Sequence, residues 1–359
     1  MIPVPSHIRA LQPYKPGKSS DPSAYSRYKA ILSSNENNYG PSPLAMEAIT
    51  EFINTVHLYP DPQGEILIDH LSSLHSCPQS HVTLSNGLDG LLYSMFKAFT
   101  VEGDHVITNE NSFIAFNKFA QMHHLSLTRV ENVDYQFHLQ GIINSIQSNT
   151  RIIYICNPNN PTGGMIPKMD LQQLLDEIPR DILVVVDEAY FNYAESIDHN
   201  FPDSSKMGFD HVLTLRTFSK LYGLAGLRIG YGVGPEHIIQ ALNKVKLVFN
   251  PNTLAQVAAA AALNDNEHVL KTLSNNKLWI SKVQNQLLAK EIRYIKSYAN
   301  FVCTIFKKDE EALNFMNFMD SHGVLLRKLD SFGMPEGVRI SIGNDEEMQY
   351  FSKVLERFK

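Results

Sequence analysis

The sequence predicts an α/β protein with a large, mostly parallel sheet between helices and a smaller second α/β domain. Three short segments, at residues 151–156, 182–187 and 211–218, are β-branched and almost continuously apolar. Strands that do not alternate are buried on both faces, as in a parallel sheet covered by helices. A helical pattern at residues 169–178 lies between the first two, so strand and helix alternate as in crossover units. At 359 residues, the chain is also too long for one compact core.

The segments on either side of this core predict the domain organisation. Residues 81–99 predict a strand, a tight turn and a helix, and residues 254–263 a tightly packed interior helix. After about residue 250 long helical stretches continue to residue 290 and are followed by shorter mixed elements. Strands are expected at 301–306, 324–326 and 338–342, and helices at 310–319 and 345–358. We therefore expect an N-terminal arm (1–34), a large domain (35–250) and a small C-terminal domain (251–359).

The composition excludes several functional classes. A formal net charge of -6 provides no basic field for nucleic acid or an anionic membrane. No stretch approaches the roughly 18 consecutive apolar residues of a membrane span, and the proline-rich N-terminus has no signal-peptide core. The three cysteines are odd in number and scattered, which fits neither a disulfide framework nor a paired-cysteine metal site. We expect a cytoplasmic protein with reduced thiols and no bound metal.

The ends of the predicted strands carry the residues for chemistry, because ligands in open parallel sheets bind beyond the carboxyl ends of the strands. The turn Gly87-Leu88-Asp89-Gly90 opens a helix, and helix N-terminal amides attract phosphate. Asn160 follows the strand at 151–156 in a turn with two prolines, which could hold its amide in one orientation. Either turn taken alone is also typical of a purely structural connection.

Two charged residues follow the next strands. Asp187 ends an apolar strand, where a carboxylate is costly to bury without a cationic partner; a structural salt bridge explains it equally well. Lys220 follows the strand at 211–218, and burial there would favour Schiff-base chemistry, although a lone lysine is more often a surface residue. Together, the anion-binding turn, the amide, the carboxylate, the lysine and Arg228 match pyridoxal phosphate, which presents a phosphate, a phenolic oxygen, a pyridine nitrogen and an aldehyde.

Longer motifs carry a family resemblance. The runs CNPNNPTG, VDEAY and RTFSKLYGLAGLRIGY occur in this order, with LQPYKPGK, LYPDPQG and SNGLDG before them and LLRKLDSFGMPEGVRISIG after them. The chain resembles the fold-type-I, pyridoxal-phosphate-dependent aminotransferases over nearly its whole length, and most closely the histidinol-phosphate aminotransferases. This resemblance implies transamination with histidinol phosphate or imidazole-acetol phosphate and with glutamate or 2-oxoglutarate.

The resemblance also implies a role for each matching residue. Lys220 would hold the cofactor as a Schiff base and move a proton between substrate carbon and cofactor. Asp187 would pair with the ring nitrogen, and Phe113 would stack on the ring. The phenolic oxygen and the phosphate would be held by further residues: Asn160 and Tyr190 for the oxygen, and Gly87, Leu88, Asp89, Ser219 and Arg228 for the phosphate. Tyr59 would reach that phosphate from a partner subunit, which implies a homodimer, while Arg339, Arg327 and Tyr14 would hold the substrate's anionic group.

Two departures from the family pattern and several alternatives stay open. Phe113 stands where the family often has Tyr, and Leu88-Asp89-Gly90 lacks the usual small hydroxyl residue. An aromatic amino acid aminotransferase for phenylalanine or tyrosine and, more distantly, a threonine-phosphate decarboxylase would need the same arginines. A catalytically silent relative is disfavoured by the intact Lys220 and Asp187. A dinucleotide-binding turn at residues 230–235 is excluded, because Pro235 stands where the last glycine should be.

Overall fold

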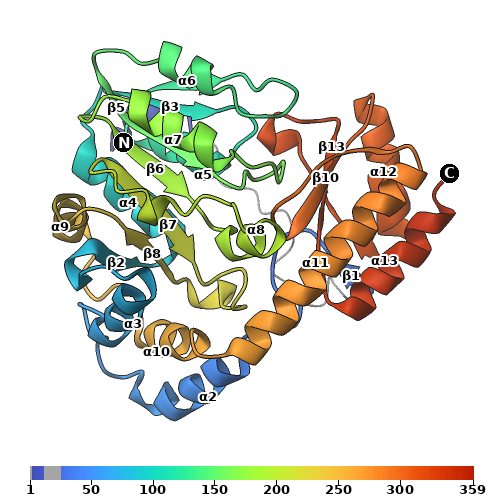
Figure 1. Cartoon of the computed structure of the whole chain (residues 1–359), viewed down its shortest axis with the longest axis horizontal. Coiled ribbons are helices and arrows are strands. Elements are labelled where there is room, and N and C mark those ends of the chain that lie inside the picture. The colour runs from blue at the N-terminus through green and yellow to red at the C-terminus, as the bar shows by residue number, and fades with distance from the viewer. Residues whose placement is uncertain (1, 12–25) are drawn as a thin grey trace.

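A seven-stranded sheet forms the larger part of the fold (Figure 1). The computed structural model describes residues 2–11 and 26–359. The strand order is β2-β8-β7-β6-β5-β3-β4, and only β8 runs antiparallel to its neighbours. The strands are β2 (Val82–Ser85), β3 (His105–Asn109), β4 (Ser126–Val130), β5 (Thr150–Cys156), β6 (Leu183–Asp187), β7 (Val212–Thr217) and β8 (Gly230–Val233).

Helices cover both faces of this sheet, as the unalternating strands predicted. Successive residues of β6 belong to opposite cores: Val185 packs with α4, α5 and α9, and Val184 packs with α6 and α7. The covering helices are α4 (Gly87–Phe99), α5 (Ile114–Met122), α9 (Glu236–Val245), α6 (Leu139–Asn144) and α7 (Lys168–Glu177). The central strands are buried on both faces, so polar residues that bind ligands are expected at the strand ends.

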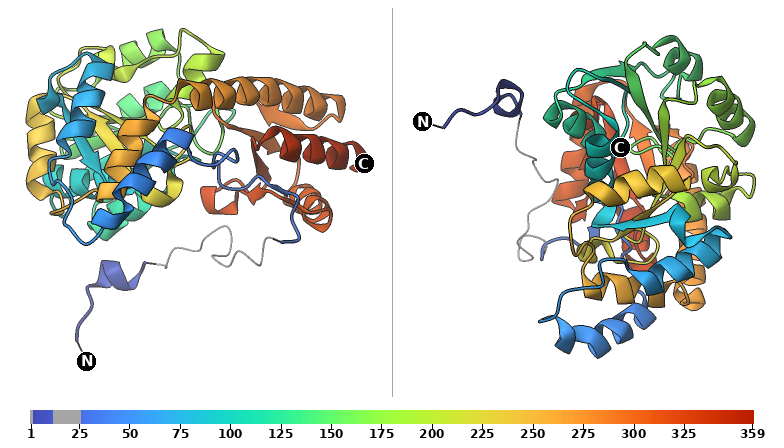
Figure 2. Two further views of the ribbon diagram at one scale, coloured as in Figure 1. Left: turned by 90° about the horizontal axis from the view of Figure 1, so that it is seen from below. Right: turned by 90° about the vertical axis from the view of Figure 1, so that its left-hand side faces the viewer.

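A smaller antiparallel sheet lies at the other end of the molecule (Figure 2). Its order is β12-β13-β10-β9, beside a two-stranded parallel pair of β1 and β11. These strands are β1 (Ala30–Ile31), β9 (Arg293–Ile295), β10 (Phe301–Ile305), β11 (Val324–Leu325), β12 (Arg327–Lys328) and β13 (Gly337–Ser341). The long helix α11 (Asn266–Ala289) packs here with α12 (Asp309–Ser321) and α13 (Asp345–Arg357). A capping box of Asn344 and Glu347 begins α13.

The remaining helices lie around the larger sheet and at its edges. They are α1 (Ser6–Arg9), α2 (Pro43–Phe52), α3 (Glu65–His75), α8 (Phe191–Ile197) and α10 (Thr253–Ala262), with 3-10 turns at η2 (Ile53–Thr55), η3 (Gln79–His81), η4 (Ser204–Lys206), η5 (Ala225–Leu227) and η6 (Asp330–Phe332). Within the described residues, none of the helices has the length and apolar character needed to cross a membrane.

The strands and helices expected from the sequence are present with small shifts at their ends. The three apolar segments form β5, β6 and β7, the pattern at 169–178 forms α7, and the expected C-terminal elements form α11, β10, α12, β11, β13 and α13. The expected domain division stays a proposal. Ala30 and Leu32 are in the core of the smaller sheet, and Ala255 packs with α2 and α3 beside the larger one. We therefore propose that the small domain includes chain from both sides of the large one.

Candidate active site

A cavity lies where the carboxyl ends of β5, β6 and β7 face the smaller sheet. It consists of a chamber of about 660 Å³ and an adjoining one of about 230 Å³. Lys220, Tyr190, Asn160 and Phe113 line both chambers. Because these residues follow four different strands, the parallel topology has brought together side chains far apart in sequence.

Lys220 lies at the junction of the two chambers. It follows β7 by three residues, and its Nζ donates a hydrogen bond to the carbonyl oxygen of Ser34 at 3.3 Å. Burial, followed by the nearby charge of Arg339, lowers the pKa of Lys220 to about 8. A substantial fraction of this amine is therefore neutral, and nucleophilic, near neutral pH.

Asp187 ends β6 and is only 2% exposed. One carboxylate oxygen accepts a hydrogen bond from the Tyr154 hydroxyl at 2.5 Å, and the other accepts one from the backbone N–H of Ala189 at 3.0 Å. Burial raises the pKa of Asp187 to about 6. In the described part of the chain, no ion pair involves this carboxylate.

The salt bridge that could have explained Asp187 belongs to the next residue. Glu188 pairs with Arg216 at 2.7 Å, and Arg216 also reaches Asp203 at 2.7 Å. Arg216 lies on β7 with its guanidinium 3.4 Å from the centre of the Phe191 ring. The guanidinium of Arg216 is thus already paired with two other carboxylates. The carboxylate of Asp187 lines the smaller chamber.

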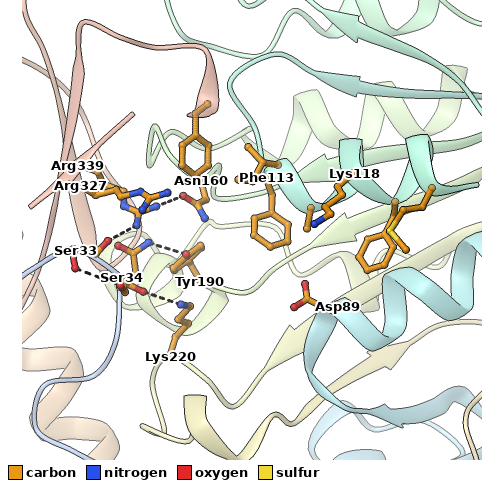
Figure 3. A pocket seen from close by; sticks show the side chains of 16 residues that line it. Ser33, Ser34, Asp89, Phe113, Lys118, Asn160, Tyr190, Lys220, Arg327 and Arg339 are labelled. Carbon is orange, nitrogen blue, oxygen red and sulfur yellow. Dashed lines mark hydrogen bonds between the residues drawn. The ribbon is translucent and has the colours of Figure 1, made fainter. Parts of the chain in front are cut away.

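Asn160 and Tyr190 line the wall beside Lys220 (Figure 3). The Oδ1 atom of Asn160 accepts a hydrogen bond from Nη1 of Arg339 at 2.6 Å. The hydroxyl of Tyr190 accepts one from Nδ2 of Asn35 at 3.0 Å. Burial raises the pKa of Tyr190 above its usual range, so its hydroxyl stays protonated and can donate a hydrogen bond.

The smaller chamber ends at the first turn of α4. Gly87 has φ +70°, and a Cβ atom added there would lie 2.7 Å from Nη2 of Arg228. The same guanidinium is 3.4 Å from Asp89 and 44% exposed. Leu88, Ser219 and Arg228 line this chamber, and the Ser219 hydroxyl accepts a hydrogen bond from Thr217 at 3.0 Å. Helix N-terminal amides, a hydroxyl and a guanidinium that gather at one end of this chamber form an anion cradle.

The two predicted substrate arginines are direct neighbours on the smaller sheet. The register of β12 and β13 places Arg327 opposite Arg339, and Figure 3 shows them together at one end of the larger chamber. Arg339 is 5% exposed and also donates to the carbonyl oxygen of Ser33 at 2.9 Å. Like charges directly opposite each other are destabilising in a sheet, so this pair favours an anion between them.

One predicted residue, Tyr59, lies away from the cavity, and another falls outside the part of the chain that the structure describes. Tyr59 is 80% exposed and stacks on Phe249 with ring centres 4.3 Å apart. Tyr14 lies outside the described residues. The other predicted residues line one or both chambers or, for Gly87, adjoin Arg228.

Three features of the site were missed in the sequence. The segment Ser33-Ser34-Asn35 touches the site through two carbonyls and one amide. Tyr154 holds Asp187, and it is the one hydroxyl-bearing residue among the apolar residues 152–155 of β5, which was a usable signal. Lys118 lines the larger chamber from α5, beyond Phe113 as seen from the arginines (Figure 3); nothing in its sequence neighbourhood marks it.

Known proteins are similar to this chain over nearly its whole length. A model of the family described as aminotransferase class I and II matches residues 28–355. Histidinol-phosphate aminotransferase 1 of Nitrosococcus oceani is 34% identical over 352 residues, which cover 97% of this chain and 95% of that protein. The histidinol-phosphate aminotransferase of Moorella thermoacetica is also 34% identical, over 97% of this chain and 91% of its own.

Solved structures agree with the sequence comparison. The histidinol-phosphate aminotransferase of Sinorhizobium meliloti in complex with pyridoxal-5'-phosphate has a TM-score of 0.88 at 26% identity and covers 98% of this chain and 97% of its own. Aspartate aminotransferase from Thermus thermophilus with maleate shares the fold, with a TM-score of 0.82 at 20% identity over 99% of this chain and all of its own. The architecture is therefore that of the fold-type-I aminotransferases. The chain belongs to the class I and II aminotransferase family.

Proposed function

We propose that this protein is a pyridoxal-phosphate-dependent aminotransferase whose amino-group donor is histidinol phosphate. The observation that carries the proposal is the buried carboxylate of Asp187 in the same cavity as the amine of Lys220, whose pKa is about 8. A buried carboxylate requires a cationic partner, and the ring nitrogen of the cofactor, once protonated, is such a partner. The full-length relatives named as histidinol-phosphate aminotransferases support the choice of substrate.

The residues present fit this cofactor group by group. Lys220 would hold its aldehyde, Asp187 its ring nitrogen and Phe113 the face of its ring. The phenolic oxygen would accept hydrogen bonds from Tyr190 and Asn160, and the cradle at the first turn of α4, with Ser219 and Arg228, would hold its phosphate. The close approach of the Arg228 guanidinium to Gly87, where a Cβ atom would collide with it, supports the last assignment.

Each side chain then has a defined part in the reaction. When bound, the cofactor supplies an electron sink for the carbanion formed at the substrate carbon. Asp187, held by Tyr154 and Ala189, would keep the ring nitrogen protonated. Lys220, which lines both chambers, would take a proton at Nζ from the substrate carbon and return it once its amine is free.

The substrate's anionic group would lie between Arg327 and Arg339. Two guanidiniums suit the two negative charges of a phosphate monoester. The wall beyond them is apolar, with Phe332, Ile114 and Met122, and it has room for the side chain of the amino acid. The same arginines would bind a carboxylate of glutamate in the second half of the reaction.

The decisive experiment compares substrates in single half-reactions. Histidinol phosphate, phenylalanine and tyrosine are mixed separately with the cofactor-loaded enzyme, and the absorbance change of the cofactor gives kcat/KM. Histidinol phosphate should react fastest by at least about 10-fold, because neutral aromatic side chains leave the arginine pair with a single carboxylate. A clear preference for phenylalanine or tyrosine would overturn the substrate and leave the reaction class standing.

We further infer that the enzyme acts as a homodimer. Tyr59 lies among large apolar side chains that are more than half exposed: Val56, Leu58, Ile66, Leu247 and Val248. Exposed apolar clusters of this kind mark protein–protein contacts. In such a dimer Tyr59 would take the role that the family resemblance implies, at the phosphate cradle of the partner subunit. Sedimentation analysis should give twice the chain mass of 40.5 kDa, and a stable monomer would refute the inference.

A further inference from the structure

Asn35 is a buried polar residue between the small sheet and the cofactor wall. It is 1% exposed and has φ +55°, a left-handed conformation that Asn tolerates better than most residues. Its backbone oxygen accepts a hydrogen bond from Asn300 at 3.1 Å. Its backbone N–H, its Oδ1 and its Nδ2 all take part in one chain of hydrogen bonds that leads from β13 to Tyr190.

The hydrogen bonds of this chain lead in one line to Tyr190. The backbone N–H of Asn35 donates to the hydroxyl oxygen of Ser341 at 2.9 Å. The hydroxyl of Ser341 donates to Oδ1 of Asn35 at 2.7 Å, so this oxygen is the acceptor of the amide. Nδ2 of Asn35 then faces Tyr190 and donates to its hydroxyl oxygen at 3.0 Å.

The last link decides what Tyr190 can do. Because its oxygen accepts from Asn35, the hydroxyl proton of Tyr190 has to point elsewhere, and no other hydrogen bond of this hydroxyl occurs among the described residues. Tyr190 lines both chambers beside Lys220. Its proton is therefore available to an acceptor in the cavity.

We propose that Asn35 is a positioning residue that holds Tyr190 as a hydrogen-bond donor toward the phenolic oxygen of the cofactor. The inference rests on the proposed function, since it assumes that this oxygen is the acceptor. A hydrogen bond donated to the deprotonated phenolic oxygen stabilises its negative charge. That stabilisation is lost when the donor is removed or points elsewhere. Asn35 borders the larger chamber, and its side-chain amide donates to the hydroxyl of Tyr190, through which it would act on the cofactor.

The test is a pH titration of the visible absorbance of the cofactor bound to Lys220, which reports the pKa of that linkage without turnover. Several charged or titratable groups surround the Tyr190 hydroxyl and are left intact: Arg339, Cys156, Asp187 and Lys220. Asn35→Ala removes the amide that orients Tyr190. The linkage pKa should change by about one pH unit, the size expected for one charge-assisted hydrogen bond, and in the same direction as in Tyr190→Phe.

Asn276→Ala is the control. Asn276 is 2% exposed, and its amide donates a hydrogen bond to the backbone carbonyl of Ala299 at 3.2 Å. It does not line either chamber. Its replacement removes a buried amide as Asn35→Ala does and should leave the linkage pKa unchanged.

Asn35→Asp gives a sharper test, because its carboxylate can only accept. The proton of Tyr190 should then turn to residue 35, away from the cavity, while Ser341 still donates to the other carboxylate oxygen. Adding Tyr190→Phe to Asn35→Asp should leave the linkage pKa where it was, whereas Tyr190→Phe alone should shift it by about one pH unit. Comparison within one background removes the effect of the added charge.

Each outcome separates the two proposals. If the untouched protein binds no cofactor at Lys220, the proposed function fails. If it does and Tyr190→Phe shifts the linkage pKa equally in both backgrounds, Tyr190 donates without help from Asn35 and the inference is overturned. Equal pKa values for Asn35→Ala, Asn276→Ala and the unaltered protein would overturn it as well.

Discussion

Replacing Asp187 by Asn should change the stability of the cofactor-free protein and its affinity for the cofactor in opposite directions. Burial raises the pKa of this carboxyl from 3.8 to about 6, so the folded protein holds its proton more tightly than the unfolded chain does. The difference corresponds to roughly 3 kcal/mol at about 1.4 kcal/mol per pH unit. That is the cost of keeping the charge buried when the pH is well above the folded-state pKa.

The sign of the pH dependence follows from the same values. Because the folded-state pKa is the higher one, the cost is absent below the unfolded pKa of 3.8 and is complete once the pH exceeds about 6. Asn carries no charge, its oxygen can accept from the N–H of Ala189, and its amide can donate to the hydroxyl of Tyr154. We therefore expect cofactor-free Asp187→Asn to be more stable by about 1–3 kcal/mol at neutral pH, with the advantage disappearing at about pH 4.

Cofactor binding should weaken in the same variant. The variant would lose the charge-assisted hydrogen bond between the Asp187 carboxylate and the ring nitrogen. This bond is worth about 1.5–3 kcal/mol, or roughly 10- to 150-fold in dissociation constant. Urea unfolding of the cofactor-free proteins and a fluorescence titration with the cofactor measure the two quantities. Glu188→Gln is the control: it removes one of the two carboxylate partners of Arg216 and should destabilise the protein by up to about 3 kcal/mol. If Asp187→Asn instead destabilises the cofactor-free protein at neutral pH, its charge is already compensated by protein groups and the reasoning fails.

Three further predictions concern the same cavity. Borohydride reduction of the cofactor-loaded protein should fix the cofactor to the peptide that contains Lys220, as mass spectrometry of a digest would show; a label on another lysine would refute the assignment. Arg327→Met should raise the free energy of unfolding by about 0.5 kcal/mol, because it relieves the pair opposite Arg339, and should raise KM for histidinol phosphate at least about 10-fold; unchanged KM would remove Arg327 from the substrate site. Lys118→Met should raise KM for glutamate about 3- to 10-fold and affect histidinol phosphate less, because this amine lies in the chamber beyond the ring position (Figure 3); equal changes for both substrates would contradict that role.

The fold was accessible from the sequence because its strongest signals are local. Continuous β-branched runs predicted β5, β6 and β7, since a strand covered on both faces needs no alternation. The glycine-containing strand β8 gave no such signal, because Gly230, Gly232 and its neighbours pack under Leu88 and Leu213 through their small size. Its place between β2 and β7 depends on contacts made across the sheet, which no local pattern records.

The site also has residues that local sequence predicted and residues that depend on tertiary contacts. Lys220, Asp187 and Asn160 could be found because each lies at the carboxyl end of a strand or within four residues after it, where topology alone delivers a side chain to the ligand edge. The sequence could not predict which of the adjacent residues Asp187 and Glu188 would form an ion pair. The folded structure shows that Arg216 pairs with Glu188. Asn35 was equally hidden, since its importance lies in the donor direction it imposes on Tyr190 across 155 positions of sequence. A sequence identifies the groups that touch a cofactor through their place at strand ends, whereas the groups that set the charge and proton direction of those residues are defined only by tertiary contacts.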